Sequence, residues 1–519
     1  MIIRLVNRTI SSLILITTIS FANIVHSQTS YIDYQSPFHS TISEGAMVAS
    51  QNHLSSEIGI EIIKKGGNAV DAAVAVGFSL AVTLPRAGNL GGGGFMLIYM
   101  KDRDEILAID YRSQSPEGLT TDQIFGVNLP DEYKKANRDI VRYGYKASTV
   151  PGTVSGLILA HSQFGKLPLE VVMRPAIEQA REGVNVSYDL EQAIASAPQL
   201  SWDPESKRIY FHEGKPLKRG EVMKRPDLAN TMNQISMNGL KGFYDGEVAE
   251  KIASSMAING GEITTDDLKK YRARFTQPIG VNYRGNKVYT HGPPSGGGIV
   301  LLTALKVLEY FDLGKIGSNS ATSYHLIAEA LRRGHNNRSH HVGDPSFYSV
   351  PYDQLMSNKR IKSFAKSISL KEASLAKEVM PLSVLQESKN TTHYSIIDSE
   401  GNAVSNTYTL GYSFGSGVTI PGTGILMNNQ MNNFAYQYGN KSIKGRAASP
   451  GNKYAPGKRP MSTMAPTIVF DENDKLLLIT GSPGGKLIPA AILRLLTGVI
   501  DFNLNIGNAT MLPRISKDW

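Results

Sequence analysis

The chain has 519 residues, of which 41% are hydrophobic and 19% charged, and its formal net charge is +9. This is the composition of an ordinary globular protein, and because the basic residues form no long run, the charge does not indicate nucleic-acid binding. The chain contains no cysteine, which excludes disulfides, thiolate metal sites and a cysteine nucleophile.

The first residues have the pattern of a secretion signal. Arg4 and Arg8 precede a mostly apolar stretch at residues 10–24, and Val25-His26-Ser27 fits a small-residue cleavage site. Residues 1–27 are therefore predicted to be a signal peptide that sends the protein to the periplasm or out of the cell. The apolar stretch is short and interrupted by Ser, Thr and Asn, so we expect no membrane insertion.

Between residues 45 and 111 the sequence predicts a compact group of strands and helices. Apolar residues recur every four positions from 54 to 62, which indicates an amphipathic helix, whereas residues 69–82 are apolar all round and indicate a buried one. The expected order is strand, helix, helix, glycine-rich loop and two paired strands, at residues 45–50, 54–66, 69–82, 88–94, 95–99 and 105–111.

The middle of the chain, from residue 150 to about 380, is predicted to be mainly helical. Amphipathic segments are expected at residues 153–164, 227–238, 247–259 and 321–340. The exception is residues 283–289, which read as a strand running into a glycine-rich segment at 292–298. Residues 366–389 are polar and lysine-rich without periodicity, and we interpret them as a linker.

After this linker the pattern changes to strands. Residues 391–398 and 402–409 alternate polar and apolar side chains around Ser399-Glu400-Gly401, which predicts a hairpin. If Gly401 is left-handed, this turn places Thr409 opposite Thr391. The Thr409 hydroxyl could then hydrogen-bond Thr391, or the two could be a plain cross-strand pair. Further strands at 467–470 and 475–480 and a helix at 487–496 suggest a layered α+β domain.

Two common functional signals are excluded. Residues 411–415, Gly-Tyr-Ser-Phe-Gly, match a serine-hydrolase elbow, but no helix pattern follows and no histidine occurs after His393. His335, His340 and His341 cluster near Asp344, but their spacing matches no zinc signature, so we expect a polar helix end and no metal site.

Catalysis is still possible through a threonine at a chain terminus. Its hydroxyl is the nucleophile and its own α-amine, which titrates near pH 7.7–8.0, is the base, so no histidine or cysteine is needed. Residues 390–395, Asn-Thr-Thr-His-Tyr-Ser, resemble the processing site of the γ-glutamyltransferases, which are N-terminal-nucleophile hydrolases. The resemblance also covers residues 66–73, 87–95, 150–153, 428–431, 459–462 and 480–485.

This resemblance implies a fold and a reaction. The fold would be an α+β four-layer αββα sandwich, formed jointly by a large subunit, residues 28–390, and a small subunit, residues 391–519, of one precursor. Cleavage between Asn390 and Thr391 would free Thr391, which then takes the γ-glutamyl group from glutathione or another γ-glutamyl compound. Water, an amino acid or a peptide would release it, and no cofactor is implied.

The resemblance also assigns residues to the site. Thr391 would be the nucleophile, Thr409 its hydroxyl partner, and Gly484 and Gly485 the oxyanion-hole residues, where glycine lets backbone N–H groups approach the charge. Arg112 matches the arginine that binds the substrate α-carboxylate; on the residues alone, an ion pair with Asp110 is the alternative. The remaining expected substrate contacts are Thr409, Gly411, Gln430, Asn433, Ser462 and Thr463.

Three features depart from the family pattern. Asn433 stands where an aspartate usually faces the substrate α-ammonium, and Gly411 stands where a polar side chain is common. Family members also continue past the position of Trp519, so an uncovered sheet edge or core face is expected. A glutaryl-type acylase on the same scaffold, or an inactive remnant, are therefore the alternatives to an active γ-glutamyltransferase.

Overall fold

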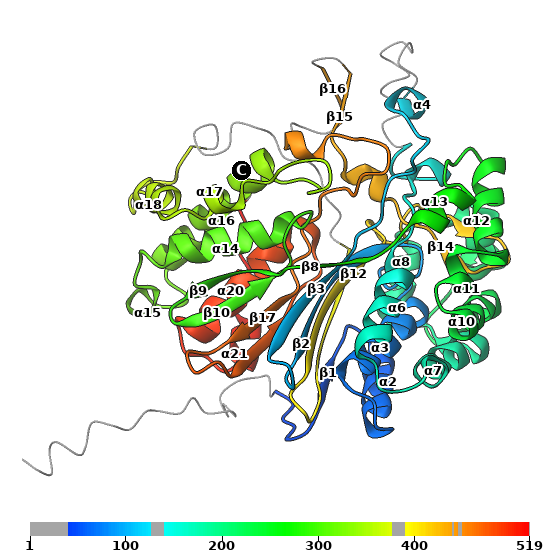
Figure 1. The fold of residues 1–519 in the computed structure, drawn as a ribbon, viewed down its shortest axis with the longest axis horizontal. Coiled ribbons are helices and arrows are strands. Elements are labelled where there is room, and N and C mark those ends of the chain that lie inside the picture. The colour runs from blue at the N-terminus through cyan, green and yellow to red at the C-terminus, as the bar shows by residue number, and fades with distance from the viewer. Residues whose placement is uncertain (1–39, 126–139, 376–389, 439–440, 445–448, 518–519) are drawn as a thin grey trace, which may run out of the picture.

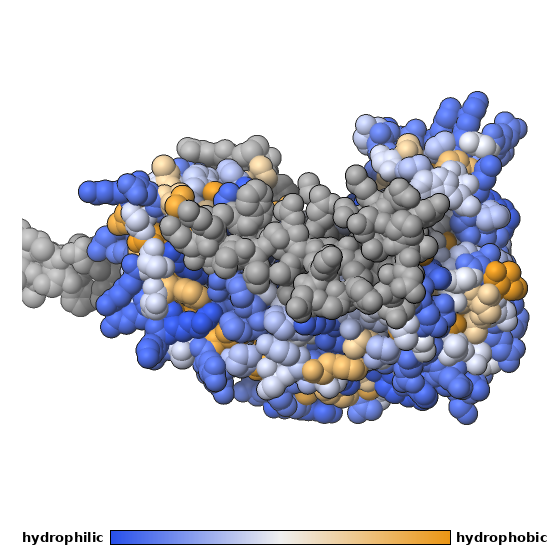
Figure 2. Space-filling view, turned by 90° about the horizontal axis from the view of Figure 1, so that it is seen from above, coloured by the Kyte–Doolittle hydropathy of each residue, from blue (hydrophilic) through white to orange (hydrophobic). Residues whose placement is uncertain are grey.

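The computed structural model describes residues 40–125, 140–375, 390–438, 441–444 and 449–517. The expected signal peptide lies outside these residues, as does the second half of the expected linker. Among the described residues, no helix has both the length and the apolar character that a bilayer crossing requires. Seen from above, the described surface is mostly hydrophilic, with hydrophobic residues in small separate groups (Figure 2).

Two antiparallel sheets stack face to face at the centre of the molecule (Figure 1). The first contains, in spatial order, β1 (Met47–Ala49), β11 (Thr392–Ile397), β12 (Ala403–Thr409), β2 (Gly93–Met100), β3 (Glu105–Tyr111) and β8 (Arg274–Thr276). The second contains β18 (Leu476–Thr480), β17 (Thr467–Phe470), β10 (Asn286–Thr290) and β9 (Ile279–Tyr283).

Helices cover the outer face of each sheet (Figure 1). Those on the first sheet are α2 (His53–Lys64), α3 (Ala69–Thr83), α6 (Thr153–Phe164) and, outside α3, α7 (Leu169–Glu182). Those on the second are α14 (Gly296–Leu308), α16 (Ala321–His341) and α20 (Ile488–Ile500). The predicted four-layer αββα sandwich is confirmed.

The remaining elements are shorter or lie outside these layers. The other helices are α4 (Thr121–Phe125), α8 (Tyr188–Ala195), α9 (Pro204–Tyr210), α10 (Pro226–Asn238), α11 (Lys241–Tyr244), α12 (Glu247–Ile258), α13 (Thr265–Lys270), α15 (Leu313–Ile316), α17 (Tyr352–Leu355), α18 (Asn358–Lys366) and α21 (Ile506–Met511). Two-stranded ribbons are formed by β4 (Val184–Asn185) with β7 (Val222–Met223), β5 (Phe211–His212) with β6 (Lys215–Pro216), β13 (Thr419–Ile420) with β14 (Ile425–Leu426), and β15 (Tyr436–Tyr438) with β16 (Lys441–Lys444).

Strand β2 shows how the alternation of side chains builds two core layers. Met96 and Ile98 belong to the core under α3 and α6, whereas Leu97 and Tyr99 pack between the two sheets with residues of β17. All of β2 is buried, because both of its faces are covered and strands pair with both of its edges. Strand β2 also pairs with β12 along its length, with Gly93 opposite Thr409.

The hairpin at residues 391–409 has the predicted register. Gly401 adopts a φ of +87°, the amide of Asp398 donates to the carbonyl of Asn402, and Thr392 pairs with Tyr408. Thr409 thus lies opposite Thr391, as expected.

The strand predicted at residues 283–289 is confirmed over residues 286–289, which belong to β10, but its start is wrong. Tyr283 ends β9, and Arg284 and Gly285 form a tight turn into β10 with φ values of +52° and +84°. Two successive positive φ values match the type I′ turn that suits the twist of paired strands. Arginine is rare in that first position, which is why the sequence pattern did not reveal the turn.

Strand β18 forms one edge of the second sheet. Within the described part of the chain no strand pairs with its outer edge. A cavity of about 590 Å³ runs beside it, between β1, β11 and α21, and its lining is mainly apolar. Leu477 of β18 is 42% exposed there.

Candidate active site

The expected cleavage bond lies at the start of the hairpin of residues 391–409, called the nucleophile hairpin below because Thr391 is its expected nucleophile. Two threonine hydroxyls lie next to this bond. Thr391 is buried, and its Oγ1 lies 3.4 Å from Oγ1 of Thr409. Both hydroxyls also donate to the carbonyl oxygen of Asn390, at 2.7 Å from Thr391 and 2.9 Å from Thr409. The two threonines are therefore not a plain cross-strand pair, because their hydroxyls polarise the carbonyl of the bond expected to break.

The backbone after β12 directs the Thr409 hydroxyl toward that carbonyl. The amide of Gly411 donates to Oγ1 of Thr409 at 2.9 Å, so the hydroxyl proton is left for Asn390. Gly411 has a φ of +104°, and a Cβ there would lie 2.2 Å from Oδ1 of Asn429. The unusual glycine is thus required by this turn.

Gln430 connects the nucleophile strand to the expected carboxylate clamp. It begins the 3₁₀ helix Gln430–Asn433, and its Nε2 donates to the carbonyl of Thr409 at 2.7 Å. Its Oε1 accepts from Nη1 of Arg112 and from the Ser113 hydroxyl. The structure therefore brings together Thr409, Gln430 and Arg112, three of the residues that the resemblance assigns to the site.

Arg112 is buried at the end of β3, and within the described ranges no carboxylate forms an ion pair with its side chain. Its Nε donates to the carbonyl of Pro460 at 3.0 Å. Burial lowers the pKa of Arg112 to about 9, so it remains a cation at neutral pH. Between these two residues the described structure has one hydrogen bond, from the backbone N–H of Arg112 to the Asp110 carboxylate. The alternative ion pair through the Arg112 side chain is therefore not formed there. This leaves a buried positive charge suited to a substrate carboxylate.

Asp110 belongs instead to a buried charge network that sequence reasoning missed. Its Oδ2 lies 2.7 Å from Arg459 and 2.9 Å from Arg274, and Arg274 also reaches Asp344 at 3.3 Å. Burial by itself would raise the pKa of Asp110, but the two arginines outweigh it and hold the pKa below 3.8. With Arg112 the group holds three arginines and two aspartates, which leaves one positive charge in excess.

Ser462 and Thr463 are held beside this network by the start of α14. The amide of Ser462 donates to the carbonyl of Pro294 at 3.0 Å, and the amide of Gly296 donates to that of Ser462 at 2.7 Å. A Cβ on Gly297 would lie 2.1 Å from the carbonyl oxygen of Thr463. The glycine-rich segment at 292–298 therefore allows this close approach, and Pro460, which accepts from Arg112, lies in the same loop.

Gly484 and Gly485 follow β18, with φ values of +123° and +56°, and lie just before α20. None of the hydrogen bonds described joins either of them to Thr391. The end of β18 is nevertheless fixed to the nucleophile hairpin, because hydroxyls of Ser395 and Ser405 donate to the carbonyls of Ile479 and Thr480 at 3.1 and 2.9 Å.

His393 supports this connection as a neutral residue. Ser395 donates its proton to Ile479, so its oxygen accepts from Nε2–H of His393 at 2.9 Å, and Nδ1 accepts from the Thr407 hydroxyl at 2.8 Å. Burial lowers the pKa of His393 to about 3. With both ring nitrogens occupied, His393 is not available as the base for Thr391.

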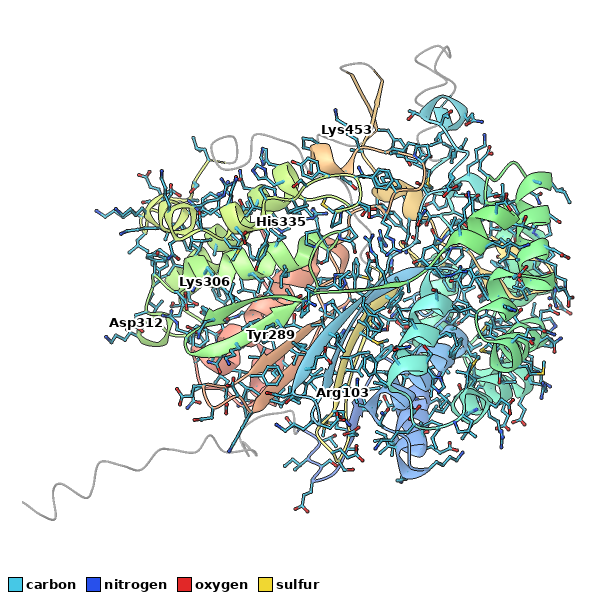
Figure 3. All side chains as sticks on the ribbon, in the orientation of Figure 1. Arg103, Tyr289, Lys306, Asp312, His335 and Lys453 are labelled. Carbon is cyan, nitrogen blue, oxygen red and sulfur yellow. The ribbon has the colours of Figure 1, made fainter. Side chains whose placement is uncertain are left out.

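Two other expectations concern residues away from these contacts. Asn433 is partly exposed, and its carbonyl accepts from Nδ2 of Asn452 at 2.8 Å; no hydrogen bond described joins its side chain to Arg112. His335 belongs to α16, in the helix layer of the second sheet (Figure 3). Across the described ranges, no three His, Asp or Glu side chains are grouped to hold a metal ion.

Comparison with known proteins gives consistent matches. Residues 55–519 match the family model described as Gamma-glutamyltranspeptidase. The chain is 41% identical to the glutathione hydrolase proenzyme of Escherichia coli, over 93% of this chain and 82% of that protein. It is 35% identical to the acylase ACY 1 proenzyme of a Pseudomonas species, over 90% and 82%.

Solved structures agree with these matches. The Helicobacter pylori gamma-glutamyltranspeptidase is 35% identical with a TM-score of 0.62, covering 65% of this chain and 96% of that one. The cephalosporin acylase from Bacillus halodurans is 27% identical with a TM-score of 0.77, covering 92% and 84%.

Proposed function

The chain belongs to the gamma-glutamyltranspeptidase family, and on this premise we propose that it is an autoprocessing glutathione hydrolase whose nucleophile is Thr391. The observation that carries the assignment is the placement of the Thr391 and Thr409 hydroxyls on the Asn390 carbonyl. The Arg112 cation is connected through Gln430 to Thr409 and forms no ion pair among the described residues. It therefore supports a substrate with a free carboxylate.

Processing would begin at the bond between Asn390 and Thr391. Oγ1 of Thr391 attacks the Asn390 carbonyl carbon, while the Thr409 hydroxyl stabilises the negative charge on the carbonyl oxygen. The C–N bond then breaks, its nitrogen takes the proton that the Thr391 hydroxyl has released and becomes the α-amine of Thr391, and an ester remains. Water hydrolyses the ester to the Asn390 carboxylate and the free Thr391 hydroxyl.

Turnover would use the same hydroxyl. The α-amine of Thr391 takes the hydroxyl proton as Oγ1 attacks the γ-glutamyl carbonyl. Arg112, with Ser462 and Thr463, binds the substrate α-carboxylate, and the N–H groups of Gly484 and Gly485 stabilise the oxyanion. The amine product leaves with the proton, and water, an amino acid or a peptide releases the glutamyl group from the ester. Gly411 would contribute only backbone atoms.

The two fragments, residues 28–390 and 391–519, would remain one folded unit. Strands β11 and β12 lie between β1 and β2 in the first sheet, so hydrogen-bonded strand pairs join the fragments on both sides. Residues 1–27 would direct export to the periplasm or the exterior.

Intact mass and N-terminal sequencing of the purified protein test the proposal directly. We expect two chains, the second beginning at Thr391, and hydrolysis of γ-glutamyl-p-nitroanilide. Thr391→Ala should stay one chain and be inactive. Thr392→Val is the matched control, because the neighbouring hydroxyl is buried with no partner among the described residues. A wild-type protein that hydrolyses the anilide while remaining one chain would exclude Thr391 as the nucleophile.

A glutaryl-type acylase is the second candidate. Asn433, in place of the usual aspartate, favours a substrate without an α-ammonium, and relatives named as acylases share the scaffold.

A further inference from the structure

A second pocket, separate from the cavity beside β18, is lined in part by Asn390 of the expected cleavage bond. Its volume is about 630 Å³, and its walls come from α8, the 3₁₀ helix Pro198–Ser201, residues 142–143 and residues 412–413. Asn390 lines it, whereas Arg112, Gln430, Asn433, Ser462 and Thr463 do not. The pocket therefore lies next to the scissile bond but apart from the residues assigned to the substrate α-carboxylate.

Arg142 gives this pocket a positive charge with which no acid among the described residues pairs. Its guanidinium carbon lies 4.3 Å from the ring centre of Tyr412 and 4.9 Å from that of Tyr143. Within the described structure the Arg142 side chain has no hydrogen bond and no ion pair, and its Nε is buried without a partner. The other arginine in the pocket, Arg86, is already paired with Asp189 at 3.0 Å.

The aromatic rings orient the guanidinium of Arg142. Both rings lie close to the guanidinium, and among the described residues none accepts from its N–H donors. These donors are the fork that binds a carboxylate in bidentate fashion. Asn429 holds the backbones of Arg142 and Tyr412 next to each other. Its Nδ2 donates to the carbonyl of Arg142, and its Oδ1 accepts from the amide of Tyr412, both at 2.9 Å. The pocket is thus connected to the turn that follows Thr409.

We propose that this pocket binds the amine side of the reaction, namely an amino acid or peptide with a free carboxylate, and that Arg142 pairs with that carboxylate. The inference rests on the proposed function. Arg112 already serves the carboxylate of the glutamyl side, so a leaving or accepting peptide needs a second cation beyond the scissile bond. In glutathione this group is a dipeptide that ends in a carboxylate.

The test compares substrates that differ in that carboxylate. Glutathione carries it in the leaving group, whereas γ-glutamyl-p-nitroanilide does not. Arg142→Gln should lower kcat/KM for glutathione by about tenfold, the usual effect of losing one charge-assisted contact, and leave the anilide unchanged. The variant should also lose the preference for glycylglycine over glycylglycinamide as acceptor.

Arg103→Gln is the matched control, since Arg103 also stacks on a ring, that of Phe164 at 5.5 Å, but lies at the far end of the sheets (Figure 3). It should change neither ratio. If the wild type hydrolyses both donors and Arg142→Gln leaves their ratio unchanged, the pocket inference is overturned; if the wild type hydrolyses neither, the proposed function fails first. Should Arg142→Gln lose both activities, the wild type is compared on glutathione and on its C-terminal amide, where equal kcat/KM values overturn the inference.

Discussion

Asp110→Asn removes the central charge of the buried network while keeping the shape of the side chain. Asp110 is fully buried and lies within 3 Å of two arginines, of which Arg459 is itself buried. Removing one partner of a buried ion pair costs about 3–5 kcal/mol, because the remaining charge stays desolvated. Unfolding entropy of about 2.1 cal/mol/K per residue gives roughly 1 kcal/mol/K for a chain of this length, so we expect Tm to fall by roughly 3–5 °C.

The measurement is thermal unfolding of both proteins in the Thr391→Ala background, so that each remains a single chain. Asp102→Asn is the control, because Asp102 is exposed and lies 3.9 Å from Arg103 at the surface. Such a pair contributes about 0–1 kcal/mol, and Tm should change by no more than about 1 °C. Equal shifts for the two variants would refute the reasoning.

The pH dependence gives a second check on the same network. The folded-state pKa of Asp110 lies below its ordinary value of 3.8, so its ion pairs contribute their full stability above that pH. As the pH falls through the folded pKa, the carboxylate of the wild type is protonated and its advantage over Asp110→Asn disappears. A difference in Tm that vanishes already between pH 7 and pH 5 would show that another group is responsible.

Two further predictions concern the site. His393→Phe should leave the Thr407 hydroxyl without its ring acceptor and cost about 1–3 kcal/mol in stability, whereas Ser395 keeps its bond to Ile479. The acid limb of the pH–rate profile should keep its midpoint, because a residue with a pKa of about 3 does not titrate there; a shifted midpoint would assign that limb to His393. Asn433→Asp should increase the preference for a γ-glutamyl over a glutaryl anilide by about tenfold, the difference between a charged and a neutral partner for the ammonium; an unchanged ratio of specificity constants would mean that Asn433 does not face the amine.

The nucleophile hairpin could be predicted because its register depends on local information. The alternation of side chains and a single left-handed Gly401 are enough to place Thr409 opposite Thr391. The buried helices were predictable for the same reason, since their periodicity lies within each segment. The turn at Arg284 failed because its residue type does not reveal the positive φ.

The charge network and the second pocket depend on residues far apart in the sequence. Asp110, Arg274 and Arg459 come from segments more than a hundred residues apart and meet only in the folded chain. The one local signal was Asp110, an aspartate within an otherwise apolar strand. A buried ion pair explains its presence there. Arg142 gave no signal, because its distinguishing property is that no acid pairs with it in the described part of the fold.

The first sheet contains strands from both sides of residue 390, and this determines the order in which folding and the proposed cleavage take place. Before cleavage the chain can refold as a single molecule. After cleavage the unfolded state would consist of two separate polypeptides, so refolding becomes a second-order process that dilution disfavours. The peptide bond therefore has to survive until the sandwich has formed. From then on, the lifetime of the active form would be governed by how slowly it unfolds, rather than by its equilibrium stability.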